Sequence, residues 1–265
     1  MTARAGWSPW LVLGGGLFVL ALLLSWFTTP VRPVWDALDV RVFFALNGTL
    51  ESGDIWRWCW AAANTRLFDL VTALSFAAVY ATFVFRGGWT HAATRVAGGI
   101  FLLAFTVFTL DVSSNYVYTF DRDSPSLVLE PAYRISDMIT AIKVKDTSGS
   151  SFPGDHGTAV LLFTIFIWFL CGRRYGLVAA AIAFVAVWPR MVGGAHWVTD
   201  LLVGSVSIAV MAGILALATP LAVWVIARIE WVLLHVLRWL HRRGWVPAAA
   251  VGSMDVHQVA ASQGD

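Results

Sequence analysis

The sequence predicts an all-α, polytopic membrane protein, and three observations support this fold class. Hydrophobic residues make up 58% of the chain and charged residues only 13%, whereas soluble domains carry about 25% charged residues. The mean hydropathy is +0.72. Several apolar stretches also approach the length of about 20 residues that a helix needs to cross the hydrocarbon core. We therefore expect six transmembrane helices, at about 9–27, 67–85, 96–113, 157–172, 176–190 and 200–219.

The first span follows Arg4, as the core of a signal peptide would. It is longer than a typical signal-peptide core and no small-x-small cleavage site ends it, so we expect it to be retained. Segment 31–46 has apolar residues at helical spacing and is expected to lie in the membrane interface. The fourth and fifth spans are short, which is expected where functional residues occupy helix ends.

The connecting segments leave no room for a second soluble domain. We expect residues 1–245 to form a single membrane-embedded domain and 246–265 to form a disordered cytoplasmic tail. Segment 221–243 mixes Trp, Ile, Leu and Val with Arg and His, so it is either an extension of the sixth span or a cytoplasmic surface helix.

Six spans place both termini on one side of the membrane. Lys and Arg divide equally, with nine on each side. The positive-inside rule is best applied to short loops near the spans, and the tight turn at Arg173-Arg174 lies on the side of the termini. We therefore expect cytoplasmic termini. Loop 114–156 and turn 190–200 then share the opposite face, so distant regions of the sequence can converge there.

One polar motif stands at the start of the fourth span, Ser151-Phe152-Pro153-Gly154-Asp155-His156. A serine before the helix can cap it, and Pro153 suits its first turn. Gly154 lets a phosphate approach the backbone, whose free N–H groups favour an anion. His156 is a candidate general acid. The simpler alternative is a capped helix start with an exposed histidine.

A second polar motif, Arg190-x5-His196-x3-Asp200, joins the fifth and sixth spans. The guanidinium of Arg190 can bind two phosphate oxygens at once. Asp200 follows His196 by four residues and shares its helix face, so it can hold Nδ1 and leave Nε2 free to attack phosphorus. The alternative is an interfacial ion pair beside the anchoring Trp197. Both motifs on one face predict a phosphoryl-transfer site.

These motifs resemble those of the type 2 phosphatidic acid phosphatase superfamily. The family's Arg-x5-His-x3-Asp motif matches in full, apart from Pro189 where Ser commonly precedes the Arg. Its second motif carries Gly154-Asp155 where Ser-Gly is usual, and its first is degenerate, with Arg122-Asp123-Ser124-Pro125 in place of Lys-x6-Arg-Pro. This combination is most similar to the lipid A 1-diphosphate synthase branch, and the similarity covers about 15–220.

The resemblance implies site roles residue by residue. His196 would be the phosphohistidine nucleophile, Asp200 its orienting acid, and His156 the acid for the leaving group. The phosphate would be cradled by Arg190, Arg122, the backbone around Gly154, and neighbouring Asp155 and Lys145. Asp155 fits this role only if it is protonated or engages a neighbouring cation, and the alternative is a charge favoured by the helix dipole.

Further cations could bind an anionic acceptor. The long loop 116–152 carries Arg134, Lys143 and Lys145, which would attract polyanionic lipids or simply bind lipid head groups. Asn64 and Arg66, at the outer end of the second span, are either acceptor contacts or interface anchors.

The resemblance implies an enzyme of the bacterial inner membrane with its active site facing the periplasm. It would move the terminal phosphate of undecaprenyl pyrophosphate to the 1-phosphate of lipid A, and hydrolysis of a lipid phosphate is the alternative. A lipid carrier or channel is disfavoured because no inverted repeat or broken helix is evident. We expect lipid partners only, with no nucleic acid, no cofactor and no metal, since adjacent cations disfavour a divalent ion.

Overall fold

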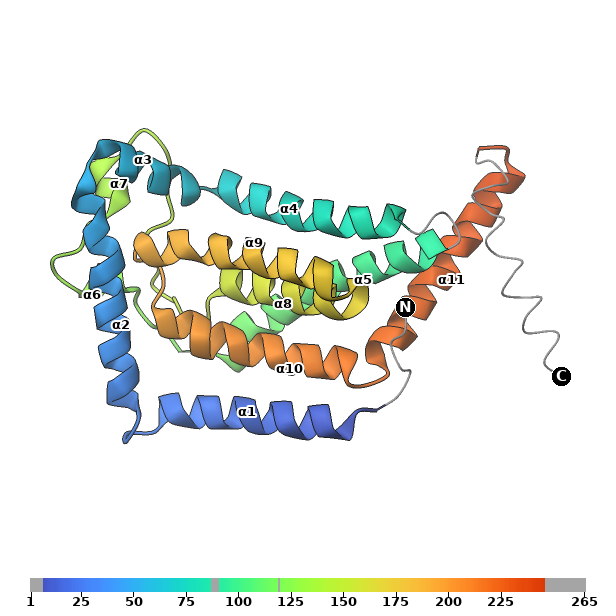
Figure 1. Cartoon of the computed structure of the whole chain (residues 1–265), viewed down its shortest axis with the longest axis horizontal. Helices are drawn as coiled ribbons and strands as arrows, with labels where there is room; N and C mark the ends of the chain where they lie inside the picture. The colour runs from blue at the N-terminus through green and yellow to red at the C-terminus, as the bar shows by residue number, and fades with distance from the viewer. Residues whose placement is uncertain (1–6, 87–90, 119, 246–265) are drawn as a thin grey trace.

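The computed structural model describes residues 7–86, 91–118 and 120–245, and every regular element in those ranges is a helix (Figure 1). This confirms the predicted all-α membrane fold. Within the described residues, five helices are long and apolar enough to cross a membrane. They are α1 (Pro9–Phe27), α4 (Arg66–Phe85), α5 (Ala92–Val112) with its π-helical continuation η3 (Ser113–Val117), α9 (Arg173–Val192), and the π-helix η4 (Asp200–Ser205) continued by α10 (Val206–Leu217).

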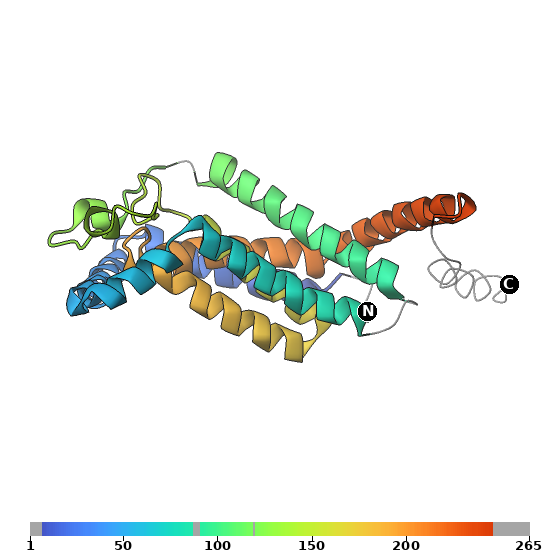
Figure 2. The ribbon, with the colours of Figure 1, turned by 90° about the horizontal axis from the view of Figure 1, so that it is seen from above.

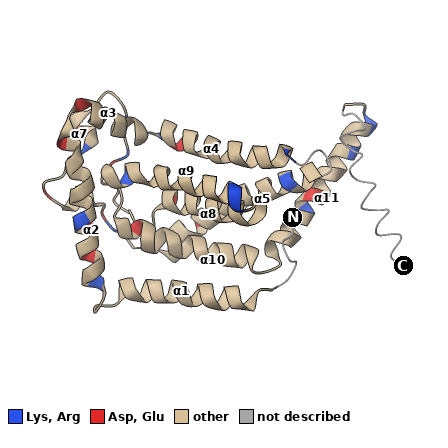
Figure 3. Ribbon diagram, viewed as in Figure 1, with Lys and Arg blue, Asp and Glu red and all other residues tan. Residues whose placement is uncertain are grey.

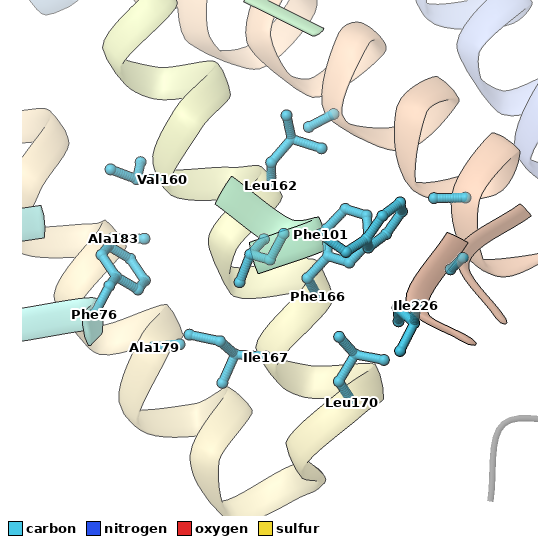
Figure 4. Packing of buried hydrophobic residues seen from close by; sticks show 14 of the residues in the cluster. Phe76, Phe101, Val160, Leu162, Phe166, Ile167, Leu170, Ala179, Ala183 and Ile226 are labelled. Carbon is cyan, nitrogen blue, oxygen red and sulfur yellow. The ribbon is translucent and has the colours of Figure 1, made fainter. Parts of the chain in front are cut away.

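A sixth apolar helix, α8 (Asp155–Cys171), has only 17 residues and lies inside the bundle. It packs against α9, α10, α5 and α4. Leu162, Phe166 and Ile167 on this helix are fully buried, and the rings of Phe101 and Phe166 meet at 5.7 Å between centroids (Figure 4). A helix that is apolar on all sides is stabilised by burial on all sides. The predicted count of six therefore holds only if this shorter central helix is included.

Two helices begin three or four residues earlier than predicted, because arginines belong to their first turns. Arg95 lies within α5, although we expected the span to begin at 96, and its Nη1 donates to the carbonyls of Phe83 and Val84 at the end of α4. The charged group is thus used to satisfy carbonyls that a helix end leaves without partners. Arg173 likewise opens α9, three residues before the predicted start at 176.

We call the end of the bundle where α2 (Arg32–Asn47) lies the motif end, and it is covered by helices shorter than a typical membrane span (Figure 1). The helix predicted at 31–46 is α2, which runs across the bundle. Asn47 at its end donates to the carbonyls of Tyr133 and Val192, both at 3.0 Å, and so fastens α2 to the loop and to α9. The other elements here are η1 (Gly48–Ser52), α3 (Asp54–Ala63), α6 (Pro125–Val128) and α7 (Ile135–Met138).

The opposite end carries the start of α1 and the end of α10, where the N–H of Ser8 donates to the carbonyl of Ala218 at 2.9 Å. From there α11 (Leu221–Arg242) extends away from the bundle (Figure 2). Charged residues gather at the two ends and are sparse along the helices between them (Figure 3). The tail predicted at 246–265 lies outside the described residues.

Candidate active site

The two sequence motifs meet at the motif end, where α8 begins, α9 ends and η4 begins. Between them lies a small pocket with about 290 Å³ of empty space. Its walls combine polar groups from both motifs with apolar side chains of α9 and η4. The lining residues are Gly154, His156, Gly157, Val187, Arg190, Met191, His196, Trp197, Asp200, Leu201 and Ser205.

His196 lines this pocket, and one of its two ring nitrogens is hydrogen-bonded to the backbone. Its Nδ1 lies 2.8 Å from the carbonyl oxygen of Ser151, and its side chain is 14% exposed. A carbonyl only accepts hydrogen bonds, so Nδ1 carries the proton and Nε2 keeps a lone pair. We predicted that Asp200 would hold Nδ1, but its Oδ2 is 3.4 Å away, and the backbone carbonyl makes the shorter contact. The resulting tautomer is the one that a nucleophilic histidine needs.

Asp200 is fully buried and makes its short hydrogen bonds elsewhere. Its Oδ2 accepts the N–H of Trp197 at 2.8 Å, and its Oδ1 accepts Nη1 of Arg122 at 2.6 Å. Asp200 thus stabilises the turn that carries His196 and places a negative charge beside the imidazole.

Arg122, predicted to bind phosphate, is held by carboxylates of the protein itself. Besides its bond to Asp200, its Nη2 donates to Oδ2 of Asp39 at 2.8 Å. Asp39 also accepts the N–H and the hydroxyl of Thr199, at 2.9 and 2.6 Å. Burial raises the pKa of Asp39, and its hydrogen bonds with Thr199 and Arg122 oppose that rise. The phosphate-binding role of Arg122 stays a prediction, which this geometry disfavours.

Asp39 is not among the site residues that the sequence motifs predict. A signal was present, because Asp39 lies four residues after Trp35 and three before Val42, on the apolar face of the helix predicted at 31–46. An acid within an apolar stripe needs a buried partner. The sequence offered no means to identify that partner as Arg122.

Arg190 is 5% exposed and is engaged on both terminal nitrogens. Nη2 lies 2.8 and 2.7 Å from the two oxygens of Asp69, and Nη1 donates to the carbonyls of Asn64 and Lys145 at 3.3 and 3.1 Å. Asp69 also lies 3.7 Å from Nδ1 of His156. A single carboxylate on α4 therefore contacts one residue of each motif.

His156 lines the pocket and is fixed by its backbone contact. Its Nε2 lies 3.1 Å from the carbonyl oxygen of Ala186 on α9, so Nε2 donates. Nδ1 is left facing Asp69, and the ring is 20% exposed. This arrangement suits a group that exchanges a proton at Nδ1.

Glycine permits the close approach of α8 to η4. A Cβ at Gly157 would lie 2.7 Å from both Cδ1 of Leu201 and Oγ of Ser205. At Gly154 a Cβ would lie 3.7 Å from Nδ1 of His196, and the Gly154 carbonyl accepts Oγ of Ser205 at 2.8 Å. The N–H of Gly154 also lies 3.5 Å from the carbonyl oxygen of Asp200, so the start of α8 packs directly against the start of η4 beside His196.

Two predicted phosphate ligands have side chains outside the pocket. Asp155 is exposed and accepts the hydroxyl of Ser114 at 3.0 Å, which places it against η3, the continuation of α5. The side chain of Lys145 is exposed, and only its backbone approaches the site, through its carbonyl to Arg190. Neither residue is among those that line the pocket.

The predicted acceptor ligands divide into two groups. Asn64 is fully buried, and its Nδ2 donates to the carbonyl of Pro189 at 2.8 Å. Arg134 is half-buried, and its Nε donates to the carbonyl of Ser126 at 2.9 Å. These contacts hold both side chains to the fold, and their role in binding the acceptor stays a prediction. Lys143 and Arg66 are exposed at the motif end. Within the described residues, no cluster of three His, Cys, Asp or Glu could hold a metal ion.

Comparisons with known proteins identify the family of this chain. Residues 99–224 match the model of the PAP2 superfamily. The chain is 32% identical over 203 residues to the lipid A 1-diphosphate synthase of Escherichia coli strain K12, an alignment covering 77% of this chain and 85% of that protein. It is 28% identical over 191 residues to a protein of the same strain provisionally named an undecaprenyl-diphosphatase, covering 71% and 84%. No solved structure matches. The chain is therefore a multi-pass membrane protein that belongs to the PAP2 superfamily.

Proposed function

We propose that this protein transfers the terminal phosphate of undecaprenyl pyrophosphate to the 1-phosphate of lipid A through a phosphohistidine at His196. One observation carries the proposal. The Nδ1 of His196 is hydrogen-bonded to the Ser151 carbonyl, so Nε2 is a nucleophile within a pocket that also holds Arg190 and His156. The similarity to a lipid A 1-diphosphate synthase supports this choice of donor and acceptor.

The reaction would proceed in two displacements. Nε2 of His196 attacks the terminal phosphorus, the bond from phosphorus to the bridging oxygen breaks, and undecaprenyl phosphate leaves with a proton supplied by His156. An oxygen of the lipid A 1-phosphate then attacks the phosphohistidine, the P–N bond breaks, and lipid A 1-diphosphate forms. Arg190 and the N–H groups at the start of α8 stabilise the negative charge on the transferred group.

Hydrolysis is the second candidate, since the second relative is provisionally named an undecaprenyl-diphosphatase. Water would then replace lipid A in the second displacement, and the first would be unchanged. We place the reaction at the periplasmic face of the bacterial inner membrane, because the short turn at Arg173-Arg174 favours cytoplasmic termini.

The proposal is tested with purified protein in proteoliposomes that contain undecaprenyl pyrophosphate labelled in its terminal phosphate. With lipid A present, we expect label in lipid A and little free phosphate, and the reverse would establish hydrolysis. His196→Ala should abolish both products and the acid-labile labelled protein. The matched control is His235→Ala, which removes an exposed histidine on α11 at the other end of the molecule. Wild-type turnover in His196→Ala would exclude the phosphohistidine.

Preference for lipid A over water requires a second anion-binding site near the first. The exposed cations Lys143 and Lys145 are the best candidates, because the Lys145 backbone contacts Arg190 and both side chains are free to reach the membrane surface. Replacing both by Ala should reduce transfer to lipid A by about 10- to 100-fold while release of free phosphate persists. Arg174→Ala, at the opposite end, serves as the control. Equal loss of both activities would contradict a separate acceptor site.

A further inference from the structure

Two buried carboxylates enclose one arginine behind the candidate nucleophile. Asp39 and Asp200 are 2% and 0% exposed, and the guanidinium of Arg122 lies between them at 2.8 and 2.6 Å. The ring centroids of Trp26 and Trp197 lie 5.4 and 4.9 Å from its Cζ. Charged groups in such surroundings are stable only when they are paired and hydrogen-bonded, so this arrangement is stiff.

The three charged groups come from three separate parts of the chain. Asp39 lies on α2, the helix that runs across the motif end (Figure 1), Arg122 lies in the loop after η3, and Asp200 opens η4. Asp39 also binds the N–H and hydroxyl of Thr199, the residue directly before Asp200. It therefore fixes both the peptide that leads into η4 and the arginine that holds Asp200.

This network continues to the imidazole of His196. Asp200 accepts the N–H of Trp197, the residue after His196, and its Oδ2 lies 3.4 Å from Nδ1 of the ring. A displacement of Asp200 would thus move both the backbone and the charge beside the nucleophile. Neither Asp39 nor Arg122 is among the residues that line the pocket.

We propose that Asp39 is a positioning residue for catalysis, and that Arg122 is the link through which it orients Asp200 and His196 rather than a ligand of the substrate phosphate. The proposal rests on the proposed function of His196 as nucleophile. It distinguishes two kinds of arginine in the site, because Arg190 lines the pocket whereas Arg122 lies behind it. The helix α2 is then a part of the catalytic apparatus and not only an interfacial anchor.

The test measures kcat and KM for labelled undecaprenyl pyrophosphate in full-length protein, with the rate of single-turnover phosphorylation of His196. Asp39→Asn should lower kcat and the phosphorylation rate by about 100-fold, because small misplacements of a reacting group have effects of that size, and KM should stay within about threefold. Arg122→Lys keeps a positive charge but loses the planar fork that spans two carboxylates, so it should show the same pattern.

The double variant Asp39→Asn/Arg122→Lys should be no slower than the slower single variant, because both changes break one linkage. Asp36→Asn is the control, since this neighbour on α2 forms an exposed pair with Arg32. A thermal melt identifies variants that fail to fold. Thr199→Val, which removes the hydroxyl that donates to Asp39 and accepts from Arg122, then replaces Asp39→Asn in the comparison.

Three results would overturn the inference. A rise in KM without a fall in kcat for Arg122→Lys would make Arg122 a phosphate ligand. Multiplicative losses in the double variant would separate the two residues. Wild-type kinetics in a folded Asp39→Asn protein would remove its positioning role. Absence of phosphorylated His196 in the wild-type protein would instead contradict the proposed function, so the two failures are distinguishable.

Discussion

Replacement of Asp69 by Asn tests whether one carboxylate on α4 organises both catalytic motifs. Asp69 holds Nη2 of Arg190 through both oxygens, at 2.8 and 2.7 Å, and lies 3.7 Å from Nδ1 of His156. The amide keeps one accepting oxygen but loses the charge, and its NH₂ group cannot accept from Arg190. We expect the guanidinium and the imidazole to lose their common anchor while the fold persists.

The expected fall in kcat/KM is estimated from the solvent exposure of Arg190 and Asp69. A hydrogen bond to a charged group contributes about 1.5–3 kcal/mol. Arg190 is 5% exposed, so water replaces the lost contact poorly, whereas the 35% exposure of the Asp69 side chain weakens the original interaction. We therefore take the lower end of the range, about 1.5 kcal/mol. Since about 1.4 kcal/mol corresponds to a factor of ten, kcat/KM should fall about tenfold.

The assay is the initial rate of phosphate loss from undecaprenyl pyrophosphate, together with a thermal melt of the same preparation. Asp54→Asn is the control, because Asp54 forms an ion pair with Arg57 on α3 but its side chain is 86% exposed. That variant should retain wild-type kinetics. A folded Asp69→Asn protein with unchanged kcat/KM would refute the bracing role. Increased activity would also refute it, because Asp69 would then compete with the substrate phosphate for Arg190.

Three further predictions concern the acid, the helix contact and the topology. His156→Ala should slow the reaction more for substrates with poor leaving groups than for those with good ones, and equal losses in steady-state rates would argue that His156 only binds phosphate. Gly157→Ala should lower the melting temperature and activity, because overpacking costs about 1–3 kcal/mol, whereas Gly14→Ala on α1, with nothing within 4 Å, should be tolerated. In a background without the native cysteines, a membrane-impermeant thiol reagent should label Thr140→Cys but not Arg174→Cys in intact spheroplasts, and the reverse pattern would invert the proposed orientation.

The sequence by itself determined the fold class and the residues of the two motifs. Helical membrane spans are encoded locally. A stretch of about 20 apolar residues is long enough to cross the lipid, and a helix satisfies the hydrogen bonds of its backbone groups within the stretch itself. The spacing of Arg190, His196 and Asp200 is local as well, and the pocket contains all three. The sequence did not determine the number of spans, because α8 has only 17 residues and is stabilised by the helices that surround it.

Only the tertiary structure decided which groups the charged residues contact. Arg122 and Asp39 are 83 residues apart, and Arg190 and Asp69 are 121 apart. Periodicity and spacing carry no information about such pairs, because a buried charge binds whichever opposite charge the packing of helices brings near it. The partner of His196 was also hidden, since the acceptor is the backbone carbonyl of Ser151 and a carbonyl is present at every residue. Sequence identified the side chains of the candidate site, whereas helix packing decided what holds them in place.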